Sequence, residues 1–263
     1  MLRVIKIRLY PNSQQQEALS QSFGNCRWLW NHCLSMMNQT YIDTGLGLSG
    51  YEVKKQIPQL KKEHEWLKLT YSQCLQQVCL NLGTAFNNFF ERRAKYPRFK
   101  SLHRKQSIQY PQNVVQIENS LRLPKIGDVK AIFHRPIEGK IKTVTVSKNQ
   151  ACQYFASILF EDGKEEATPS TEGKNIGIDL GLTPNFAITS EGSKFDNPRW
   201  IDKHEKNLKI KQQQLSRKHS WSNNRNKSRL KVAKVHLKIA NCRSDFHALA
   251  ITQDSKREQS YLC

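Results

Sequence analysis

The apolar residues of this 263-residue chain change their spacing near residue 106, and this change constrains the fold more than any other feature. Before it, apolar residues recur every three or four positions, as they do on the buried face of a helix. After it, they alternate in short runs separated by turn residues, which is typical of strands. The first pattern predicts helices over residues 12–42, 51–64, where Pro58 breaks the helix, and 72–94.

Residues 2–10 share the strand-like alternation, with Ile5, Ile7 and Leu9 on one face and basic residues on the other. Several short strands after a helical block predict a small β-barrel or sandwich, which this N-terminal strand would complete. The helical block is then an insertion in a β domain. The further strands expected in this domain are residues 107–110, 114–118, 121–124, 129–133, 141–147 and 153–161.

Residues 174–182, Lys-Asn-Ile-Gly-Ile-Asp-Leu-Gly-Leu, follow an acidic segment at 163–173 that indicates a domain linker. Apolar residues alternate here as in a buried strand, and Asp179 falls on the opposite parity, beside a turn. A return strand is expected within residues 183–192. Nucleases of the RNase H-like fold begin with such a pair, and their Asp binds divalent ions. On this stretch alone, Asp179 is equally well explained as a turn-capping acid.

A helical stretch follows residue 200, is interrupted by the Ser- and Asn-rich residues 216–226, and resumes near Arg225. Its second part carries lysines at helical spacing with no acid at neighbouring positions. A solvated helix face is a common explanation for such a stripe. Because four like charges repel one another, an opposing polyanion explains it better. The four residues are Lys227, Lys231, Lys234 and Lys238.

The chain has 42 Lys and Arg against 22 Asp and Glu, a formal net charge of +20 spread along its length. Such an excess favours a polyanionic partner, and nucleic acid is the leading candidate. A membrane surface competes, but no segment reaches the roughly 20 apolar residues of a spanning helix. The N-terminus lacks the apolar block of a signal peptide, so we expect a cytoplasmic protein.

Two basic segments are candidate phosphate contacts. In the first, cations alternate with rings, which suits phosphate contact with ring stacking, but a solvated helix end with two anchoring aromatics is equally good. The second is the loop at 134–142, where a solvated charged hairpin is the usual alternative. The candidates are Arg92, Arg93, Lys95, Tyr96, Arg98, Phe99 and Lys100 in the first segment and Arg135, Lys140 and Lys142 in the second.

The seven cysteines stand at irregular spacings without a Cys-x-x-Cys pair, so neither a disulfide framework nor a zinc site is predicted. Most are expected in the core. Cys26 and Cys33 fall on one helical stripe, and Cys74 and Cys79 lie near the start of another. Trp28, off the first stripe, is expected to cover a neighbouring helix rather than to stack on a base.

Six motifs carry a family resemblance. They are Phe23-Gly-Asn-Cys-Arg-Trp-Leu-Trp-Asn, Asn87-Asn-Phe-Phe, Tyr96-Pro-Arg-Phe-Lys, His134-Arg-Pro-Ile-Glu-Gly-Lys-Ile-Lys-Thr-Val-Thr-Val, Gly177-Ile-Asp-Leu-Gly and Asn241-Cys-Arg-Ser-Asp-Phe-His. In this order they resemble the OrfB/TnpB proteins of insertion sequences over residues 1–247. The family is similar to miniature RNA-guided DNA endonucleases, in which a guide RNA supplies sequence specificity by pairing.

The resemblance implies an α+β multidomain protein that binds guide RNA and target DNA. A β-barrel wedge domain would comprise residues 1–10 and 97–162, and residues 11–96 would be its helical recognition insert. Residues 174–248 would form the first part of an RNase H-like, RuvC-like α/β domain. There Asp179 aligns with the first catalytic carboxylate, which binds Mg²⁺ in the intact family.

Members continue into a strand with a catalytic Glu, a four-cysteine zinc finger and a last catalytic Asp, and these are absent here. The expectation is a C-terminally truncated member with an aberrant tail at 249–263. It would bind nucleic acid in DNA transposition in a prokaryotic cytoplasm, at the nucleoid, with cleavage lost. The alternatives are an active endonuclease restored by frameshifting or by a second polypeptide, and a non-functional remnant.

Overall fold

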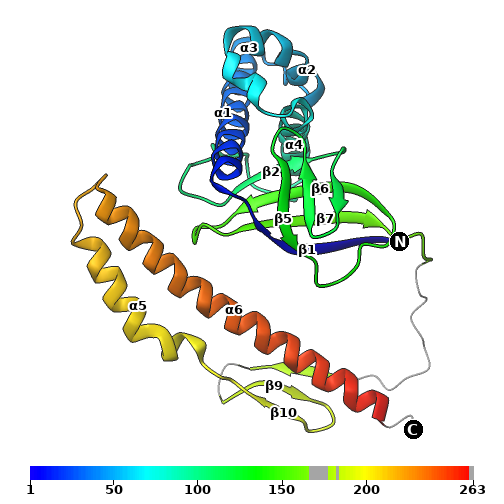
Figure 1. Cartoon of the computed structure of the whole chain (residues 1–263), viewed down its shortest axis with the longest axis vertical. Helices are drawn as coiled ribbons and strands as arrows, with labels where there is room; N and C mark the ends of the chain where they lie inside the picture. Colours follow the sequence, from blue (N-terminus) through cyan, green and yellow to red (C-terminus); the bar gives the residue numbers. More distant parts are fainter. Residues whose placement is uncertain (166–176, 182–183, 261–263) are drawn as a thin grey trace. The chain divides into compact units, whose positions relative to one another are not determined.

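A computed structural model describes residues 1–165, 177–181 and 184–260 (Figure 1). The chain divides into two compact units, Met1–Glu166 and Ala167–Cys263, and each is described by itself. Helices and strands alternate in blocks, which confirms the expected mixed α and β composition. Most of the linker expected at 163–173 lies outside the described residues.

The first unit contains a curled seven-stranded sheet in the order β2-β6-β7-β1-β5-β4-β3, with antiparallel pairing throughout (Figure 1). The N-terminal strand lies in its middle, between β5 and β7, so residues 2–10 join the later strands in one sheet, as expected. The two end strands are β2 and β3. The strands are β1 (Leu2–Tyr10), β2 (Gln106–Tyr110), β3 (Val115–Ile117), β4 (Ser120–Leu123), β5 (Gly127–Ile132), β6 (Lys140–Lys148) and β7 (Tyr154–Glu161).

The helices of the first unit lie between β1 and β2 in the chain. A capping box of Asn12 and Gln15 starts the long first helix. Pro58 occupies the first turn of α3, where its missing N–H costs nothing, so the break expected there falls at Gln56. The helix expected to reach residue 94 ends at Phe90. The elements are α1 (Ser13–Thr44), α2 (Gly50–Lys55), α3 (Ile57–Glu63), the 3₁₀ helix η1 (Glu65–Leu69) and α4 (Ser72–Phe90).

One apolar core joins the sheet to the helices, from Ile7 on β1 to Leu29 on α1. All four cysteines expected in the core are buried, and burial raises the pKa of the Cys26 thiol to about 12. Trp28 is partly buried and packs edge-on against the rings of His64 and Trp66, at 4.7 and 4.9 Å between centroids. The expected covering role of Trp28 is therefore confirmed.

Helices α2 and α4 approach each other so closely that only glycine fits between them. A Cβ atom on Gly50 would lie 2.8 Å from the carbonyl oxygen of Cys79 and 3.2 Å from the Cα of Gly83. Gly24, within α1, is different, because the nearest atom that its Cβ would meet is the flexible Arg27 Nη2 at 3.9 Å.

We expect Gly50→Ala to lower the free energy of unfolding by about 1–3 kcal/mol, because the two backbones must separate to admit a methyl group. The matched variant Gly24→Ala should raise it by about 0.5–1 kcal/mol, because alanine restricts the unfolded chain more than glycine. Urea denaturation of the two variants beside the parent protein measures both changes. A shift of both in the same direction would contradict the close approach of α2 and α4.

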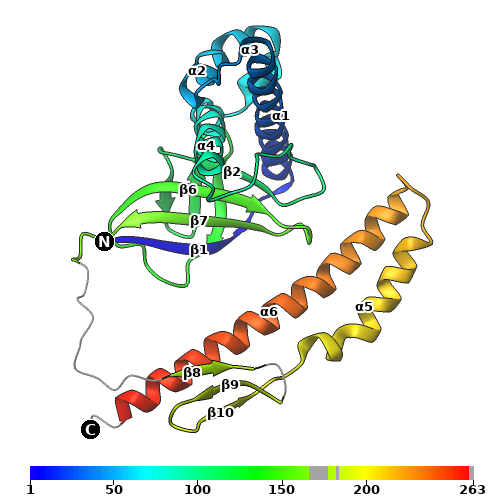
Figure 2. The ribbon, with the colours of Figure 1, turned by 180° about the vertical axis from the view of Figure 1, so that it is seen from behind.

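The second unit combines a small sheet with a helical hairpin (Figure 2). The sheet has the order β10-β9-β8, with β8 (Ile178–Leu180), β9 (Asn185–Thr189) and β10 (Lys194–Asp196). Helix α5 (Trp200–Ser216) packs along α6 (Asn223–Ser260). Phe186 of β9 contacts Phe246 and His247 of α6, at 5.3 and 5.1 Å between ring centroids. These contacts join the sheet to the hairpin. No described helix is apolar and long enough to cross a membrane.

Candidate nucleic-acid interface

A basic tract, residues 92–105, leaves the end of α4 and runs past α1 toward β2. Side chains of α1 hold the tract in place through hydrogen bonds to its main chain. Trp30 Nε1 donates to the carbonyl oxygen of Arg98 at 3.0 Å. Asn31 donates through Nδ2 to the carbonyl oxygen of Lys100 and accepts from its N–H through Oδ1, at 3.0 and 2.7 Å. Because these bonds engage the backbone of the tract, they leave the Arg98 side chain available.

The cations predicted in this tract have different surroundings. Arg92 and Lys95 are exposed, and Arg93 forms an ion pair with Glu91. Lys100 places its Nζ atom 3.8 Å from the centre of the Trp30 ring, and burial of the ammonium there lowers the pKa of Lys100. Arg92 and Lys95 are therefore better placed for a phosphate than Lys100.

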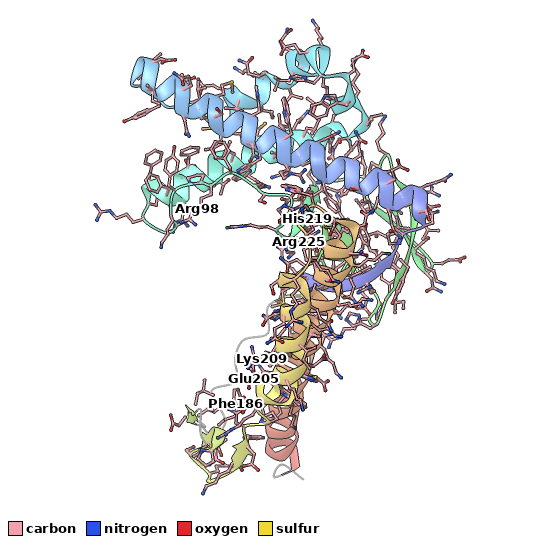
Figure 3. The ribbon with its side chains drawn as sticks, turned by 90° about the vertical axis from the view of Figure 1, so that its left-hand side faces the viewer. Arg98, Phe186, Glu205, Lys209, His219 and Arg225 are labelled. Atoms are coloured by element: carbon pink, nitrogen blue, oxygen red, sulfur yellow. The ribbon has the colours of Figure 1, made fainter. Side chains whose placement is uncertain are left out.

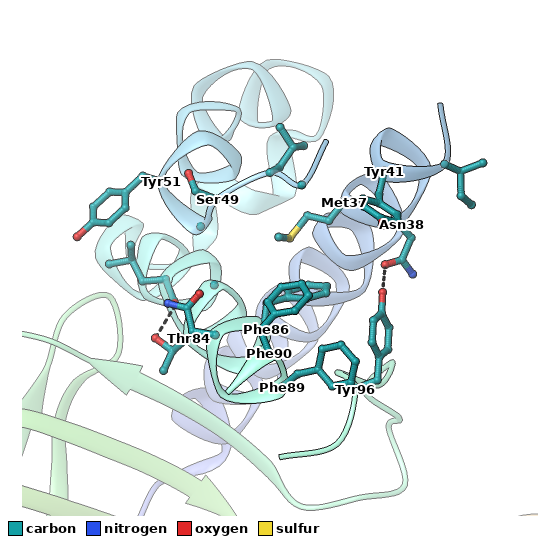
Figure 4. Close-up of a pocket in the computed structure, with 17 residues that line it drawn as sticks. Met37, Asn38, Tyr41, Ser49, Tyr51, Thr84, Phe86, Phe89, Phe90 and Tyr96 are labelled. Carbon is teal, nitrogen blue, oxygen red and sulfur yellow. Dashed lines mark hydrogen bonds between the residues drawn. The ribbon is translucent and has the colours of Figure 1, made fainter. Parts of the chain in front are cut away.

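The two predicted aromatics of the tract also differ. Tyr96 is anchored, since its hydroxyl donates to Asn38 Oδ1 at 2.6 Å and its ring meets Phe86 and Phe89 edge-on. It lies in the wall of an aromatic groove of about 830 Å³ between α1, α2 and α4 (Figure 4). Phe99 is 59% exposed and offers a ring to solvent.

Three cations that were not predicted line a second crevice: Arg27 of α1, and Arg104 and Lys105 of the tract itself. This crevice has a volume of about 260 Å³ and is bounded by α1, α4, β2 and the tract. The tract brings these cations together where it packs on α1. The sequence alone does not show this packing, so the crevice was not predicted. The basic residues that line the crevice are Arg27, Arg98, Lys100, Arg104 and Lys105.

The loop expected at 134–142 ends before β6, so Arg135 lies in the loop whereas Lys140 and Lys142 lie on the strand, and all three are exposed. Lys142 pairs with Glu161 of β7, with its Nζ atom 2.6 Å from a carboxylate oxygen, and this bond lowers the pKa of Glu161. Lys142 is thus tied to the sheet, whereas Arg135 lies in the connection before β6. The structure does not bring these three residues together with Asp179 in one unit.

The lysine stripe, defined as Lys227, Lys231, Lys234 and Lys238, is exposed along α6. Among the residues that the structure describes, no carboxylate forms an ion pair with any of the four. From first to last the stripe extends about 16 Å along the helix, which is close to the rise of five base pairs. Ala233 and Ile239, on other sides of α6, are buried, whereas Ala240 is exposed.

Helix α5 carries further exposed cations, including Lys209, which Figure 3 shows on the hairpin with Glu205. Residues 206–244 contain 12 Lys and Arg and no Asp or Glu. The loop between the helices also carries Trp221, which is 91% exposed. The sequence prediction missed both the α5 cations and this ring. The absence of any acid over 39 residues was the signal that could have revealed them.

Asp179 lies in the middle of β8, opposite Ile188 of β9, and is exposed. The neighbouring apolar residues were expected to be buried, and this expectation is wrong: Ile178 is 57% and Leu180 is 70% exposed. The reason is that β8 is the end strand of a three-stranded sheet, with nothing described on its far side. Gly181 allows a close approach, because a Cβ there would lie 2.8 Å from the carbonyl oxygen of Asn185.

Asp179 could supply one oxygen ligand to Mg²⁺, which is bound in proteins through one or two carboxylates and several waters. No group of three or more His, Cys, Asp or Glu that could hold a metal occurs among the described residues. The described part of the chain therefore fits a single Mg²⁺ ligand, which is less than a two-ion centre requires.

Two family matches cover separate parts of the chain. Residues 157–253 match the OrfB_IS605 family, described as "Probable transposase". Residues 1–45 match HTH_OrfB_IS605, described as "Helix-turn-helix domain". In the structure these 45 residues form β1 and the whole of α1, a strand and a single helix, so this segment alone does not contain a helix-turn-helix.

Curated relatives extend the match to nearly the whole chain. It is 33% identical over 272 residues to "Putative RNA-guided DNA endonuclease InsQ" of Escherichia coli (strain K12), covering 97% of this chain and 66% of that protein. It is 36% identical over 251 residues to "Putative RNA-guided DNA endonuclease" of Streptomyces pristinaespiralis, covering 93% and 62%. "Virulence protein VsdF" of Salmonella dublin is 33% identical over 116 residues, which is 40% of this chain and 98% of that protein.

The chain thus spans about two thirds of the length of the two endonuclease relatives. Its similarity to them runs through the helical block, the sheet and the hairpin alike. Together with the two family matches, this similarity confirms the resemblance indicated by the motifs. The chain belongs to the transposon-associated OrfB/TnpB family.

Proposed function

We propose that this chain binds RNA and DNA in the context of DNA transposition, with the α5–α6 hairpin as its main phosphate-binding surface. One observation carries the proposal: the lysine stripe is exposed, and no described carboxylate neutralises it. Such a stripe repels itself unless a polyanion lies opposite. The basic tract and its crevice, in the other unit, supply a second contact surface.

The names of two relatives contain the term RNA-guided, and this term suggests that the bound RNA is a guide. In an RNA-guided protein, base pairing reads the target sequence, and the protein holds the backbone of the RNA–DNA heteroduplex. We assign the curled sheet with its helical insert to a wedge domain with a recognition insert. The second unit is assigned to a RuvC-like domain. The RNA is then a guide derived from the element, and the protein acts at the nucleoid of a prokaryotic cell.

We assign Asp179 as a Mg²⁺ ligand inherited from the nuclease domain. Hydrolysis by two ions requires enough carboxylates to hold both, one ion beside the attacking oxygen and the other beside the leaving oxygen. Asp179 alone cannot hold both ions. The proposal is therefore that these 263 residues by themselves bind a guide-matched target without cutting it.

The test uses the purified chain, an RNA transcribed from the end of the element, and a plasmid carrying a matching target. We expect the RNA to stay bound through purification, and the plasmid to remain uncut in Mg²⁺. Asp179→Ala should leave RNA binding unchanged, because the carboxylate is not part of the phosphate-binding surface. Mg²⁺-dependent cutting that Asp179→Ala abolishes would overturn the claim about cleavage, and loss of RNA during purification would overturn the claim about binding.

A further inference from the structure

The loop between α5 and α6 presents one aromatic ring to solvent. Trp221 is 91% exposed, more than any other large apolar residue described in this chain. Its backbone φ angle is 68°, in the left-handed region that non-glycine residues rarely adopt. Neither packing nor backbone preference therefore accounts for a tryptophan at this position. A residue that is both strained and unpacked indicates a role outside folding.

The loop is held by its own hydrogen bonds, so the backbone position of Trp221 in the loop is defined. Arg225, from the first turn of α6, donates through Nη1 to the carbonyl oxygen of Lys218 at 3.1 Å. Ser222 donates through Oγ to the carbonyl oxygen of His219 at 2.8 Å and accepts from the N–H of Arg225 at 3.1 Å. These bonds close the loop on both sides of Trp221. Figure 3 shows Arg225 and His219 together at this end of the hairpin.

The charged residues near Trp221 in the sequence are all basic. Arg217, Lys218, Arg225 and Lys227 lie within six positions of Trp221, and the nearest acids in sequence are Glu205 and Asp245. An exposed ring among cations is the arrangement with which proteins hold single-stranded nucleic acid. The bases stack on the ring while the cations contact the phosphates.

We propose that Trp221 stacks on an unpaired base of RNA or DNA bound along the α5–α6 hairpin. This inference rests on the proposed function, since the lysine stripe must first hold the strand. The base must be unpaired or at a helix end, because a base inside a duplex is already stacked on both faces. An anionic membrane is the competing partner for a tryptophan beside lysines, but the adjacent residues, Ser220 and Ser222, are polar and give no apolar face to insert.

The test compares Trp221→Gly and Trp221→Phe in the full chain. Glycine adopts the left-handed conformation freely, so Trp221→Gly should not lower the melting temperature, which separates stacking from folding. We expect Trp221→Gly to weaken binding of a fluorescein-labelled single strand, oligo(U) or oligo(dT), about 10- to 100-fold, while Trp221→Phe keeps most of the affinity. Affinity for a duplex of the same length should change less than twofold.

The salt dependence of the dissociation constant distinguishes base stacking from phosphate contact. The slope of log Kd against log salt should be the same for Trp221→Gly and the parent protein, because no cation is removed. Unchanged single-strand affinity in Trp221→Gly would overturn the stacking proposal and leave the proposed function standing. Equal losses on single strand and duplex would also overturn it, as would an effect seen only on phosphatidylserine vesicles. A parent protein that binds neither probe would overturn both proposals.

Discussion

Replacing Lys227, Lys231, Lys234 and Lys238 together by Gln should lower the affinity of the chain for duplex nucleic acid about 10²- to 10³-fold at 0.1 M salt. Each lysine that contacts a phosphate releases counterions on binding, and this release is the main source of affinity. The four lysines are exposed and unpaired among the described residues, so little structure depends on them. Fluorescence anisotropy with a labelled 20-base-pair duplex measures the change.

A matched control variant removes four positive charges from a different surface of the chain. Four exposed lysines in the first unit, outside the basic tract, can be replaced by Gln in the same way. We expect this variant to lose less than about tenfold, because a change in net charge without contact acts only through the long-range field. Equal losses in the two variants would show that net charge, and not the lysine stripe, determines binding. The control lysines are Lys62, Lys68, Lys125 and Lys130.

Asn25→Ala should lower the free energy of unfolding by about 2–4 kcal/mol. Asn25 lies buried on α1, and its Nδ2 atom donates to the carbonyl oxygen of Trp66 and to Oγ1 of Thr70, both at 2.9 Å. Alanine would leave both acceptors buried without this donor and would leave a cavity beside η1. Urea denaturation followed by circular dichroism measures the loss.

Asn81→Ala is the matched control for this prediction. Asn81 is also helical, but its Nδ2 atom donates to Gln109 Oε1 at 3.1 Å in an exposed position. Water can replace that partner, so the free energy of unfolding should change by less than about 0.5 kcal/mol. If both variants lose the same amount, Asn25 is not the buried connection between α1 and η1 that the structure shows.

The motif at 23–31 illustrates what sequence reasoning could reach. Its residues identified the family, but their role in the structure is to form hydrogen bonds. Asn25 donates to a carbonyl oxygen of η1, whereas Trp30 and Asn31 donate to carbonyl oxygens of the basic tract. These partners lie between 41 and 69 residues away in the chain. Hydrophobic periodicity is a local signal, and it cannot show which distant carbonyl a side chain will reach.

Elements with strong periodicity were predicted closely. The strand expected at residues 2–10 is Leu2–Tyr10, and the helix expected to end near 42 ends at Thr44. The prediction of a buried strand around Asp179 was wrong. Alternating apolar and polar residues show that the two faces of a strand differ in polarity, but they do not show that another element packs on the apolar face. Burial of Ile178 and Leu180 depends on neighbours that the three-stranded sheet does not include.

The candidate nucleic-acid contacts also divide into those with a local sequence signal and those that depend on long-range packing. The lysine stripe was predicted because its spacing is helical and local, and the structure places all four residues on the surface of α6. The crevice lined by Arg27, Arg104 and Lys105 was not predicted, because it forms only where the basic tract packs on α1. Lys100 was predicted as a phosphate contact, and its packing on Trp30 also depends on that loop.

The central claim is that the lysine stripe binds phosphates, and the most direct measurement is the slope of log Kd against log salt for duplex binding. Each phosphate contact contributes about 0.9 to this slope, so replacing all four lysines by Gln should reduce it by about 3–4. Parallel slopes for the parent protein and this variant would contradict the claim, even if their affinities differed.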